Sequence, residues 1–579
     1  MPSTHNEPAR SRAAAGDEPD PPHNLSPGTR DLAALQEHNF VERWLQDHLT
    51  AVAAMVVAAG FVIRLVVAGQ GFFNPDEAIH YTLFHQRSIF LAYKASLTNA
   101  HPPLIYFLLY FWQLLGRSEV MLRLPSVLAG TAFCWWTFRW VGICFSKTAS
   151  LMALVIVSFS PALIDLSAEL REYALLLCFV AAALYYLELA FRDNSVRHLV
   201  YFSVALYLAI LSHYSAAFVV LAAGLYALVR FAAARSPRPI LAAWVTGQAG
   251  AAAIYGLLYV THLSKLHSSI PFWAAPFNSY LFHGATLHGG IADIFTFLLR
   301  STPDIFLYLF AQTYVANLFL ALWIVSLAIL FVYGMIPGRT YPRSGQLALL
   351  LGLPFVAIWG AALAGKYPYV GSRHTVFLAP VAVAAVSALL ASMATQKLWR
   401  GLLIAGLLMG VSNAWGHSPE ALSTPANQRR ALMSAAVTYM QQSIPRSDLI
   451  LVDYQSSSAI EYYLCAATDI RTYPDPQGDF VPLSCNGHSI VSLDERSWEL
   501  RAGNFSSAFE RLAHQYGLKP GDRVWVFQTG WGVNLAAELQ RYPQFRCLAP
   551  QRFGDNIAII PFEVGPTLLP AIPGTHCAQ

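Results

Sequence analysis

Charged residues are scarce in this chain. Asp, Glu, Lys and Arg make up 12% of its 579 residues, about half of the roughly 25% that is typical of soluble domains. The formal net charge is only +4, which gives no reason to expect a nucleic-acid partner. Hydrophobic residues make up 55% of the chain, and the mean hydropathy is +0.44. The composition excludes an ordinary soluble protein and predicts a chain embedded in lipid.

Other familiar signals are also missing. No CxxC pair occurs, so a zinc site built on cysteines is not expected. No signal peptide opens the chain, because the first apolar run begins near Ala51, and the polar residues 1–48 predict a disordered tail. Three of the seven cysteines lie in or beside apolar segments. The other four lie in a polar C-terminal region, where disulfides are expected with their pairing left open: Cys465, Cys485, Cys547 and Cys577.

Long apolar segments dominate the rest of the chain. A transmembrane helix needs about 20 mainly apolar residues, and the candidate segments are 50–69, 121–141, 148–166, 173–191, 199–212, 214–230, 239–260, 312–334, 345–364, 375–393 and 399–416. Residues 101–116 and 291–310 are apolar but short or interrupted, and they predict helices lying in the membrane interface. The predicted fold is an α-helical polytopic membrane protein with about 11 transmembrane helices plus interfacial helices.

Basic residues mark one side of the predicted bundle. They occupy alternate short connections, at Arg139, Lys147, Arg192, Arg197, Arg230, Arg235, Arg238, Arg339, Arg343, Lys397 and Arg400. Such residues favour the cytoplasmic side, which makes the tail 1–48 cytoplasmic. An odd number of spans in the transmembrane domain 49–417 then places residues 418–579 outside. That last region has strand-like runs at Leu449–Val452 and Val524–Phe527, each followed by a helix-like segment, and it predicts a soluble α/β domain.

Unusual polar residues gather in the connections on the opposite, outer side. They are Asp76, Glu77, His80 and His101 in the first outer loop (70–120), then Glu169, Arg171, Tyr173 and His213, and later Lys366, Tyr367, Tyr369, Arg373 and His374. Dispersed polar groups on one face predict a single site at that interface. Arg64, within the first span, is expected only to extend its charge to the membrane surface.

The segment Phe72–Tyr81 has two interpretations. In the structural interpretation, Asn-Pro forms a turn and Asp76-Glu77 begin a helix. The acidic side chains then only cap the unpaired N–H groups at the start of that helix. In the functional interpretation, a carboxylate at this position takes a proton from an acceptor hydroxyl. A divalent metal is a third interpretation, because Glu77 and His80 lie three residues apart and Asp76 and His80 lie four apart. No further ligand follows at a suitable spacing, so no cofactor is predicted.

Cationic side chains in Lys366–Pro380 suit a phosphate ligand. Arg373 and Lys366 lie just outside a span that begins near Thr375, at the depth of lipid headgroups. A purely structural interpretation is that they anchor the loop in the interface. We take the candidate substrate-binding residues to be His80, His101, Arg171, Tyr173, Lys366, Tyr369, Arg373 and His374.

The ordered motifs resemble a known superfamily. Asp76-Glu77, then His101-Pro102-Pro103-Leu104, then Arg123-Leu124-Pro125-Ser126, and a Lys-Tyr-Pro segment before a late span are similar to the C-type glycosyltransferases. The branch is that of protein O-mannosyltransferases and bacterial aminoarabinose transferases. The resemblance implies that Asp76 is the catalytic base, with Glu77 beside it. It also implies that Lys366, Tyr369 and Arg373 hold the carrier phosphate, with Arg171 as a weaker match.

A membrane glycosyltransferase is therefore the expected function. Nucleotide sugars are cytosolic, so a site outside needs a donor such as a polyprenyl-phosphate-linked sugar; the acceptor would be a glycan, lipid or protein, in a bacterial inner membrane. One base opposite the leaving phosphate predicts inversion. A lipid-linked substrate transporter or flippase would instead carry ionisable groups at mid-membrane depth and an internal repeat. The sequence also allows a non-catalytic scaffold, or the transfer of an oligosaccharide or a non-sugar group from the same carrier.

Overall fold

We describe the protein from a computed structural model. The described residues are 40–233, 237–269, 291–335, 343–416, 429–465, 470, 480–493, 502–530, 534–542 and 544–565. The tail expected at residues 1–48 lies mostly outside this part of the chain. Arg235, Arg339 and Cys577 also lie outside it.

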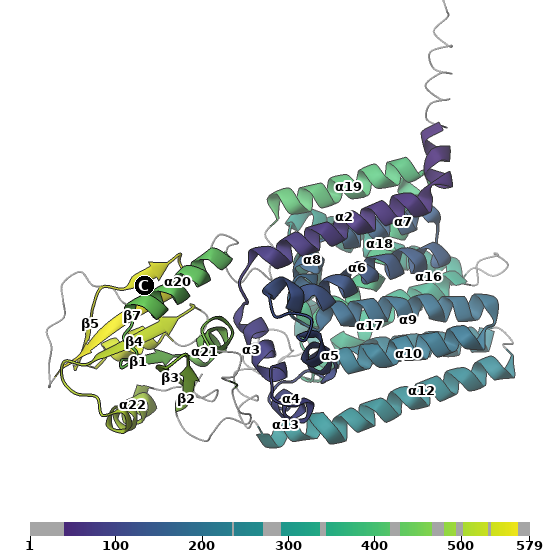
Figure 1. Cartoon of the computed structure of the whole chain (residues 1–579). Coiled ribbons are helices and arrows are strands. Elements are labelled where there is room, and N and C mark those ends of the chain that lie inside the picture. The colour runs from purple at the N-terminus through teal and green to yellow at the C-terminus, as the bar shows by residue number, and fades with distance from the viewer. Residues whose placement is uncertain are drawn as a thin grey trace, which may run out of the picture. The chain divides into compact units, whose positions relative to one another are not determined.

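Long apolar helices run side by side to form a bundle (Figure 1). In the described residues, seven helices are long and apolar enough to cross a membrane, or eight if one bent pair counts as a single span. A helix lies at each of the eleven predicted positions, but the count of eleven spans is not confirmed, because some of these helices fall short of that test. The bundle helices are α2 (Leu49–Gln70), α6 (Glu119–Cys144), α7 (Lys147–Phe159), α8 (Pro161–Ser167), α9 (Tyr173–Asp193), α10 (Val196–Ser212), α11 (Ala216–Ala233), α12 (Arg238–Leu258), α16 (Thr313–Met335), α17 (Arg343–Leu363), α18 (Ala379–Met393) and α19 (Leu398–Trp415).

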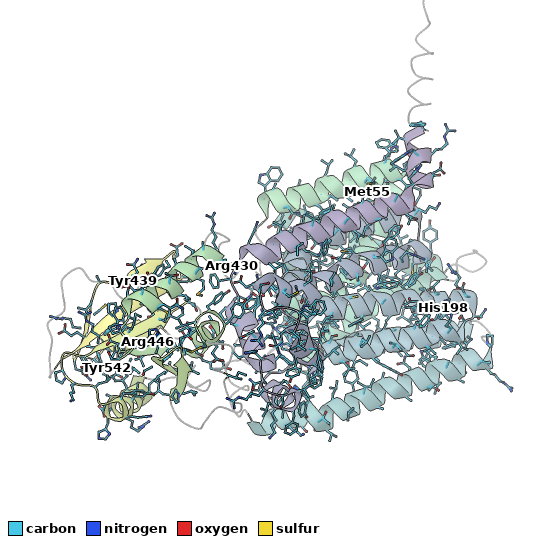
Figure 2. The ribbon with its side chains drawn as sticks, in the orientation of Figure 1. Met55, His198, Arg430, Tyr439, Arg446 and Tyr542 are labelled. Carbon is cyan, nitrogen blue, oxygen red and sulfur yellow. A yellow bond between two sulfur atoms is a disulfide. The ribbon has the colours of Figure 1, made fainter. Side chains whose placement is uncertain are left out.

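The helices of the bundle differ in how much of their surface is covered by the rest of the protein. Of the most apolar window of α9, 83% is buried by other parts of the protein, against 28% for α2. Both helices are strongly apolar, so α2 presents most of its apolar surface outward, where only lipid can cover it. His198, labelled in Figure 2, lies near the end of the bundle where α9 connects to α10. Several predicted cytoplasmic basic residues lie at this end, among them Arg192 and Arg197.

A broken helix in the bundle explains Arg64. Helices α7 and α8 meet at an angle of 61°, because Ser160 is extended and Pro161 begins the next helix without an N–H donor. The freed carbonyls of Val157 and Ser158 accept hydrogen bonds from the Arg64 guanidinium at 3.1 and 2.9 Å. Arg64 is fully buried. The expectation that it extends to the membrane surface is wrong, since the unpaired backbone groups inside the bundle hold it there.

The connection after α2 is built from short helices. These are α3 (Pro75–Phe84), α4 (Ile89–Ser96) and α5 (Leu104–Trp112), and α5 lies within the predicted interfacial segment 101–116. The second predicted interfacial segment, 291–310, forms α15 (Ile291–Phe310). Its exposed Phe295 and Leu299 contrast with the buried Phe306 and Phe310.

The C-terminal region is an α/β domain, as predicted. Its sheet has the order β2-β3-β1-β4-β7-β5, with β6 paired to β7, and β1 is parallel to both β3 and β4. The elements are α20 (Arg430–Ser443), β1 (Leu449–Val452), α21 (Tyr454–Tyr463), β2 (Phe480–Cys485), β3 (His488–Leu493), α22 (Ala502–Tyr516), β4 (Arg523–Gln528), α23 (Leu535–Gln540), β5 (Phe545–Cys547), β6 (Gln551–Phe553) and β7 (Ile557–Val564). Figure 2 labels Tyr439 and Arg446 on the chain leading into this sheet. A disulfide joins Cys465 to Cys485, which settles one pairing that the sequence left open.

Candidate active site

Helix α3 places Asp76 at its N-terminus. The Asn74 side chain accepts a hydrogen bond from the Glu77 backbone N–H at 3.0 Å, and the Glu77 carboxylate accepts from the Asn74 N–H at 3.1 Å. Pro75 fills the first helical position. This capping box satisfies two unpaired donors of the helix start and fixes its direction. Local sequence therefore determines where Asp76 lies.

Glu77 has a structural role in this arrangement. It is buried, and both of its carboxylate oxygens receive hydrogen bonds from the guanidinium of Arg123 at 2.7 Å. Arg123 also donates to the carbonyl oxygens of Ala68, Gly71 and Phe72. The Arg-Leu-Pro-Ser segment thus holds the turn before α3. Since the oxygens of Glu77 are occupied, we interpret it as a positioning residue, although the sequence placed it beside Asp76 as a catalytic candidate.

Asp76 binds two arginines through one oxygen. Its Oδ2 lies 2.8 Å from Arg171 Nη1 and 2.6 Å from Arg373 Nη2. The Asp76 side chain is 30% exposed and that of Arg373 is 23% exposed, whereas Arg171 is 3% exposed. Burial alone would raise the pKa of Asp76, but the charges of Arg373 and Arg171 outweigh it and hold this pKa well below its ordinary value. The Asp76 carboxylate is therefore ionised at neutral pH in this arrangement, and it lies between two cations at a partly exposed position.

Close packing positions the loop that carries Arg373. A Cβ atom at Gly371 would lie 2.0 Å from the carbonyl oxygen of Asp304 in α15, so this position admits only glycine. The Tyr369 hydroxyl lies 3.0 Å from Thr302 Oγ1, also in α15. Tyr369 is thus buried against α15, and no described contact joins it to Asp76. Lys366 is exposed and likewise has no described contact with Asp76.

Glu172 is the residue at this site that sequence reasoning missed. It is fully buried, and its carboxylate lies 3.1 Å from His80 Nε2, 3.1 Å from His101 Nδ1 and 3.8 Å from Arg171 Nε. Burial alone would raise the pKa of Glu172, but its interactions with His101, Arg171 and His80 outweigh burial and hold this pKa well below its ordinary value. From the sequence, Glu169 is the natural partner of Arg171. Instead, Glu169 accepts a hydrogen bond from the Asn74 amide at 3.2 Å.

The predicted histidines and Tyr173 lie around this carboxylate. His80 Nδ1 donates to the Asp76 carbonyl oxygen at 2.8 Å. The Tyr173 ring packs against His101, His213 and His374, at centroid distances between 5.3 and 6.3 Å. Burial lowers the pKa of His101 well below its ordinary value. The structure therefore brings together His80, His101, Arg171, Tyr173, Arg373 and His374, but not Tyr369.

A cavity of about 650 Å³ opens beside this cluster. Its lining includes His101, His213, His374, Tyr255, Tyr367 and Lys366. The rings and hydroxyls suit the faces and hydroxyl groups of a sugar. Lys366 thus belongs to the wall of the cavity rather than to the Asp76 cluster.

One group of side chains has the composition of a metal site. The ligand atoms of His101, Glu172 and His213 lie within 4.8 Å of one another, and this set suits a zinc-like cation. However, Nδ1 of His213 accepts a hydrogen bond from the backbone N–H of Ser215 at 3.1 Å. The same Nδ1 lies 2.7 Å from Ser215 Oγ, to which it can donate a hydrogen bond in the other tautomer. In that tautomer the lone pair is on Nε2, so only the first tautomer opposes a metal at His213.

Comparison with known proteins identifies the fold. The crystal structure of ArnT from Cupriavidus metallidurans bound to undecaprenyl phosphate matches with a TM-score of 0.54 over 90% of this chain and 99% of that one, at 13% identity. The apo form of the same protein matches with a TM-score of 0.51 at 12% identity, with the same coverage. The chain therefore shares the fold of this ArnT.

Sequence comparison agrees with that fold. The family model Dolichyl-phosphate-mannose-protein mannosyltransferase matches residues 100–255, about a quarter of the chain. No curated protein matches the full sequence significantly. An oligosaccharyltransferase of Archaeoglobus fulgidus matches with a TM-score of 0.47 at 13% identity, over 83% of this chain and 69% of that one. The resemblance to C-type glycosyltransferases drawn from the sequence is confirmed.

Proposed function

We propose that this chain is an integral-membrane glycosyltransferase that moves a sugar from a polyprenyl-phosphate carrier to an acceptor hydroxyl. The observation that carries the proposal is the ionised Asp76 between Arg171 and Arg373, beside a sugar-sized cavity. A carboxylate can take a proton from the acceptor, and arginines can bind a phosphate. ArnT, which has this fold, was crystallised with undecaprenyl phosphate, so a carrier of that class is the natural donor lipid.

The reaction is an in-line displacement. The acceptor oxygen attacks the anomeric carbon while the bond from that carbon to the phosphate oxygen breaks. Asp76 takes the acceptor proton, and the electron pair leaves on the phosphate, whose charge Arg373 and Arg171 stabilise. Because acceptor and leaving group lie on opposite faces of the sugar, the product has the inverted configuration.

Glu172 makes Arg171 less free to move than Arg373. Arg171 is buried between Asp76 and Glu172, whereas Arg373 is partly exposed and contacts Asp76. An incoming phosphate can therefore recruit Arg373 while Arg171 stays fixed. Movement of Arg373 from Asp76 to the phosphate would raise the basicity of Asp76 once the donor is bound.

The orientation follows from the basic residues. We place the tail 1–48 in the cytoplasm, the transmembrane domain at 49–417 with its site on the outer face, and the domain 418–579 outside, in a bacterial inner membrane. A disulfide between Cys465 and Cys485 suits an oxidising compartment. The acceptor is a glycan, lipid or protein that reaches this face. No metal is assigned to the reaction, since the arginines supply the cationic charge.

The Asp76→Asn variant tests whether this chain is a transferase that uses Asp76 as its base, as opposed to a transporter or a scaffold. Asp76→Asn, in purified protein with a short-chain polyprenyl-phosphate sugar, should lower kcat by about 10²–10⁴-fold, the usual loss for a general base. Donor binding should remain near wild type, while Tm should fall modestly, because the buried Arg171 loses one of its two carboxylate partners. Asp193→Asn, which removes an exposed carboxylate paired with Arg192 at the other end of the bundle, is the matched control. Wild-type turnover in Asp76→Asn would show that Asp76 is only a helix cap, whereas the absence of sugar transfer by the wild-type protein would favour a transporter or a scaffold.

A further inference from the structure

The C-terminal α/β domain contacts the turn from which the Asp76 helix starts. The backbone N–H of Phe73 donates a hydrogen bond to the hydroxyl oxygen of Tyr463, the last residue of α21, at 2.8 Å. Phe73 directly precedes Asn74, the N-cap of α3. The rings of Phe73 and Tyr462 also pack together, with centroids 4.5 Å apart. Asp76 thus lies three residues beyond a backbone group that Tyr463 holds.

The turn has little other freedom. Arg123 binds the carbonyl oxygens of Gly71 and Phe72, and the capping box binds the N–H groups of Asn74 and Glu77. The hydrogen bond to Tyr463 holds the Phe73 N–H between these two sets. Removing it would leave a partly buried backbone donor without its partner, which is unfavourable. The turn could relieve that cost only by moving or by admitting water.

The position of Tyr463 is fixed by a hydrogen bond of its hydroxyl and by a disulfide close to it in the chain. Its hydroxyl donates to the carboxylate of Glu119, a buried residue at the start of α6. The other oxygen of Glu119 lies 2.8 Å from Arg430 Nε, at the start of α20. Directly after α21, Cys465 is joined to Cys485 of β2. The hydroxyl therefore has a fixed place relative to both the turn and the sheet.

We propose that the C-terminal domain is a working part of the transferase, and that Tyr463 is a positioning residue for Asp76. This inference rests on the proposed role of Asp76 as the base. Through Tyr463 the domain fixes the start of α3, and with it the distance from the Asp76 carboxylate to the acceptor hydroxyl. Small displacements of a catalytic group lower the rate of the chemical step more than they lower substrate affinity.

The neighbouring tyrosine provides a matched control. The Tyr462 hydroxyl donates to the carbonyl oxygen of Arg117 at 2.8 Å, so it also joins α21 to the first outer loop. It does not bind the turn before α3. Tyr462→Phe and Tyr463→Phe therefore each remove a tyrosine hydroxyl that joins α21 to this loop, and both keep the aromatic ring. Only Tyr463→Phe removes the hydrogen bond at the catalytic turn.

The test uses the full-length protein in lipid nanodiscs and two readouts. Tyr463→Phe should lower kcat by about 10–100-fold, with the donor KM changed by less than about twofold. Hydrogen–deuterium exchange in the peptide spanning residues 72–77 should become faster. Tyr462→Phe should change neither quantity. Unchanged kcat, or unchanged exchange in that peptide, would overturn the positioning role of Tyr463.

The two proposals fail in different ways. If Asp76 is not the base, Asp76→Asn keeps its activity while Tyr463→Phe still accelerates exchange at the turn. If Tyr463→Phe does not fold, Glu119→Ala serves instead, because it removes the acceptor that holds the Tyr463 hydroxyl toward the Phe73 N–H. That variant should show the same pattern of changes with smaller amplitude. Wild-type kcat and exchange in Glu119→Ala would then overturn the inference.

Discussion

Arg373 lies 2.6 Å from the carboxylate of Asp76, although 297 residues separate them in the chain. In the C-type glycosyltransferase reaction proposed here, the arginine would bind the donor and the carboxylate would deprotonate the acceptor. Without a donor they neutralise each other. Donor binding and activation of the base would therefore be linked through a single ion pair.

The ion pair of Asp76 and Arg373 determines how stability and kcat/KM should depend on pH. The pKa of Asp76 is lowered in the folded protein, mainly by Arg373 and Arg171 acting against burial. Its contribution to stability is present above the unfolded-state pKa of about 3.9 and is lost only as pH falls through the lower folded-state value. The acid limb of kcat/KM should therefore not arise from Asp76 above about pH 4.

Arg373→Gln should change that acid limb. Without Arg373, only Arg171 and His80 oppose burial, so the pKa of Asp76 should rise and Asp76 should set an acid limb at higher pH than in the wild type. Arg373→Lys keeps the charge and should move it less. The measurement is the pH dependence of kcat/KM for all three proteins, which reports ionisations of the free enzyme. An identical acid limb in Arg373→Gln would show that Asp76 does not control it.

Local motifs were predictable from the sequence, and distant pairings were not. Asn-Pro-Asp-Glu encodes its own helix start, so the position of Asp76 could be read from adjacent residues. Glu172 could not be assigned, because its partner His80 lies 92 residues away and the nearby Glu169 is an equally good partner for Arg171. The assignment of Tyr369 to the donor phosphate stays a prediction. A phenol at an interface can bind either a phosphate or a neighbouring hydroxyl, and here its hydroxyl lies 3.0 Å from Thr302 Oγ1 of α15.

Glu77→Gln should mainly affect stability. Arg123 is buried, and its charge is balanced by the Glu77 carboxylate. Loss of one partner of a buried ion pair typically costs about 3–5 kcal/mol, because the other charge stays buried. We expect a clear drop in Tm and expression, with kcat of the remaining folded protein lowered far less than in Asp76→Asn. Asp193→Asn, in an exposed pair, should leave Tm nearly unchanged. Normal Tm with a loss of kcat as large as that of Asp76→Asn would instead make Glu77 catalytic.

Chelation of divalent metals should leave activity intact. Arg171 and Arg373 supply the positive charge beside Asp76 that a metal would otherwise provide. The measurement is sugar transfer before and after treatment with EDTA, with the metal content of the protein determined by mass spectrometry. Loss of activity that zinc or magnesium restores would assign a metal to His101, Glu172 and His213.

The proposed orientation can be tested with single cysteines. Lys366 and Arg197 are both exposed, and they belong to connections at opposite ends of the bundle. In a background carrying Cys144→Ser, a membrane-impermeant maleimide added to intact spheroplasts should label Lys366→Cys but not Arg197→Cys. After permeabilisation both should react. The reverse pattern would place the site in the cytoplasm and remove the reason for a lipid-linked donor.

Donor affinity should depend more on Arg373 than on Lys366. Arg373 is held at Asp76 and can bind a phosphate through two N–H groups, whereas Lys366 lines the cavity and offers a point charge. Arg373→Ala should weaken binding of a short-chain polyprenyl-phosphate sugar and lower kcat together, because the arginine contacts the phosphate both before and during its departure. Arg373→Lys should recover part of the loss.

Lys366→Ala is the comparison that separates phosphate recognition from general charge. It removes one positive charge from the same loop, so a purely electrostatic attraction of the donor would weaken equally in both variants, and the effect would disappear at high salt. Recognition by the guanidinium predicts a much larger loss for Arg373→Ala that persists at high salt. If Arg373→Ala binds the donor as well as wild type does, the Arg373 pair serves only to fix Asp76. The phosphate must then be held by Arg171.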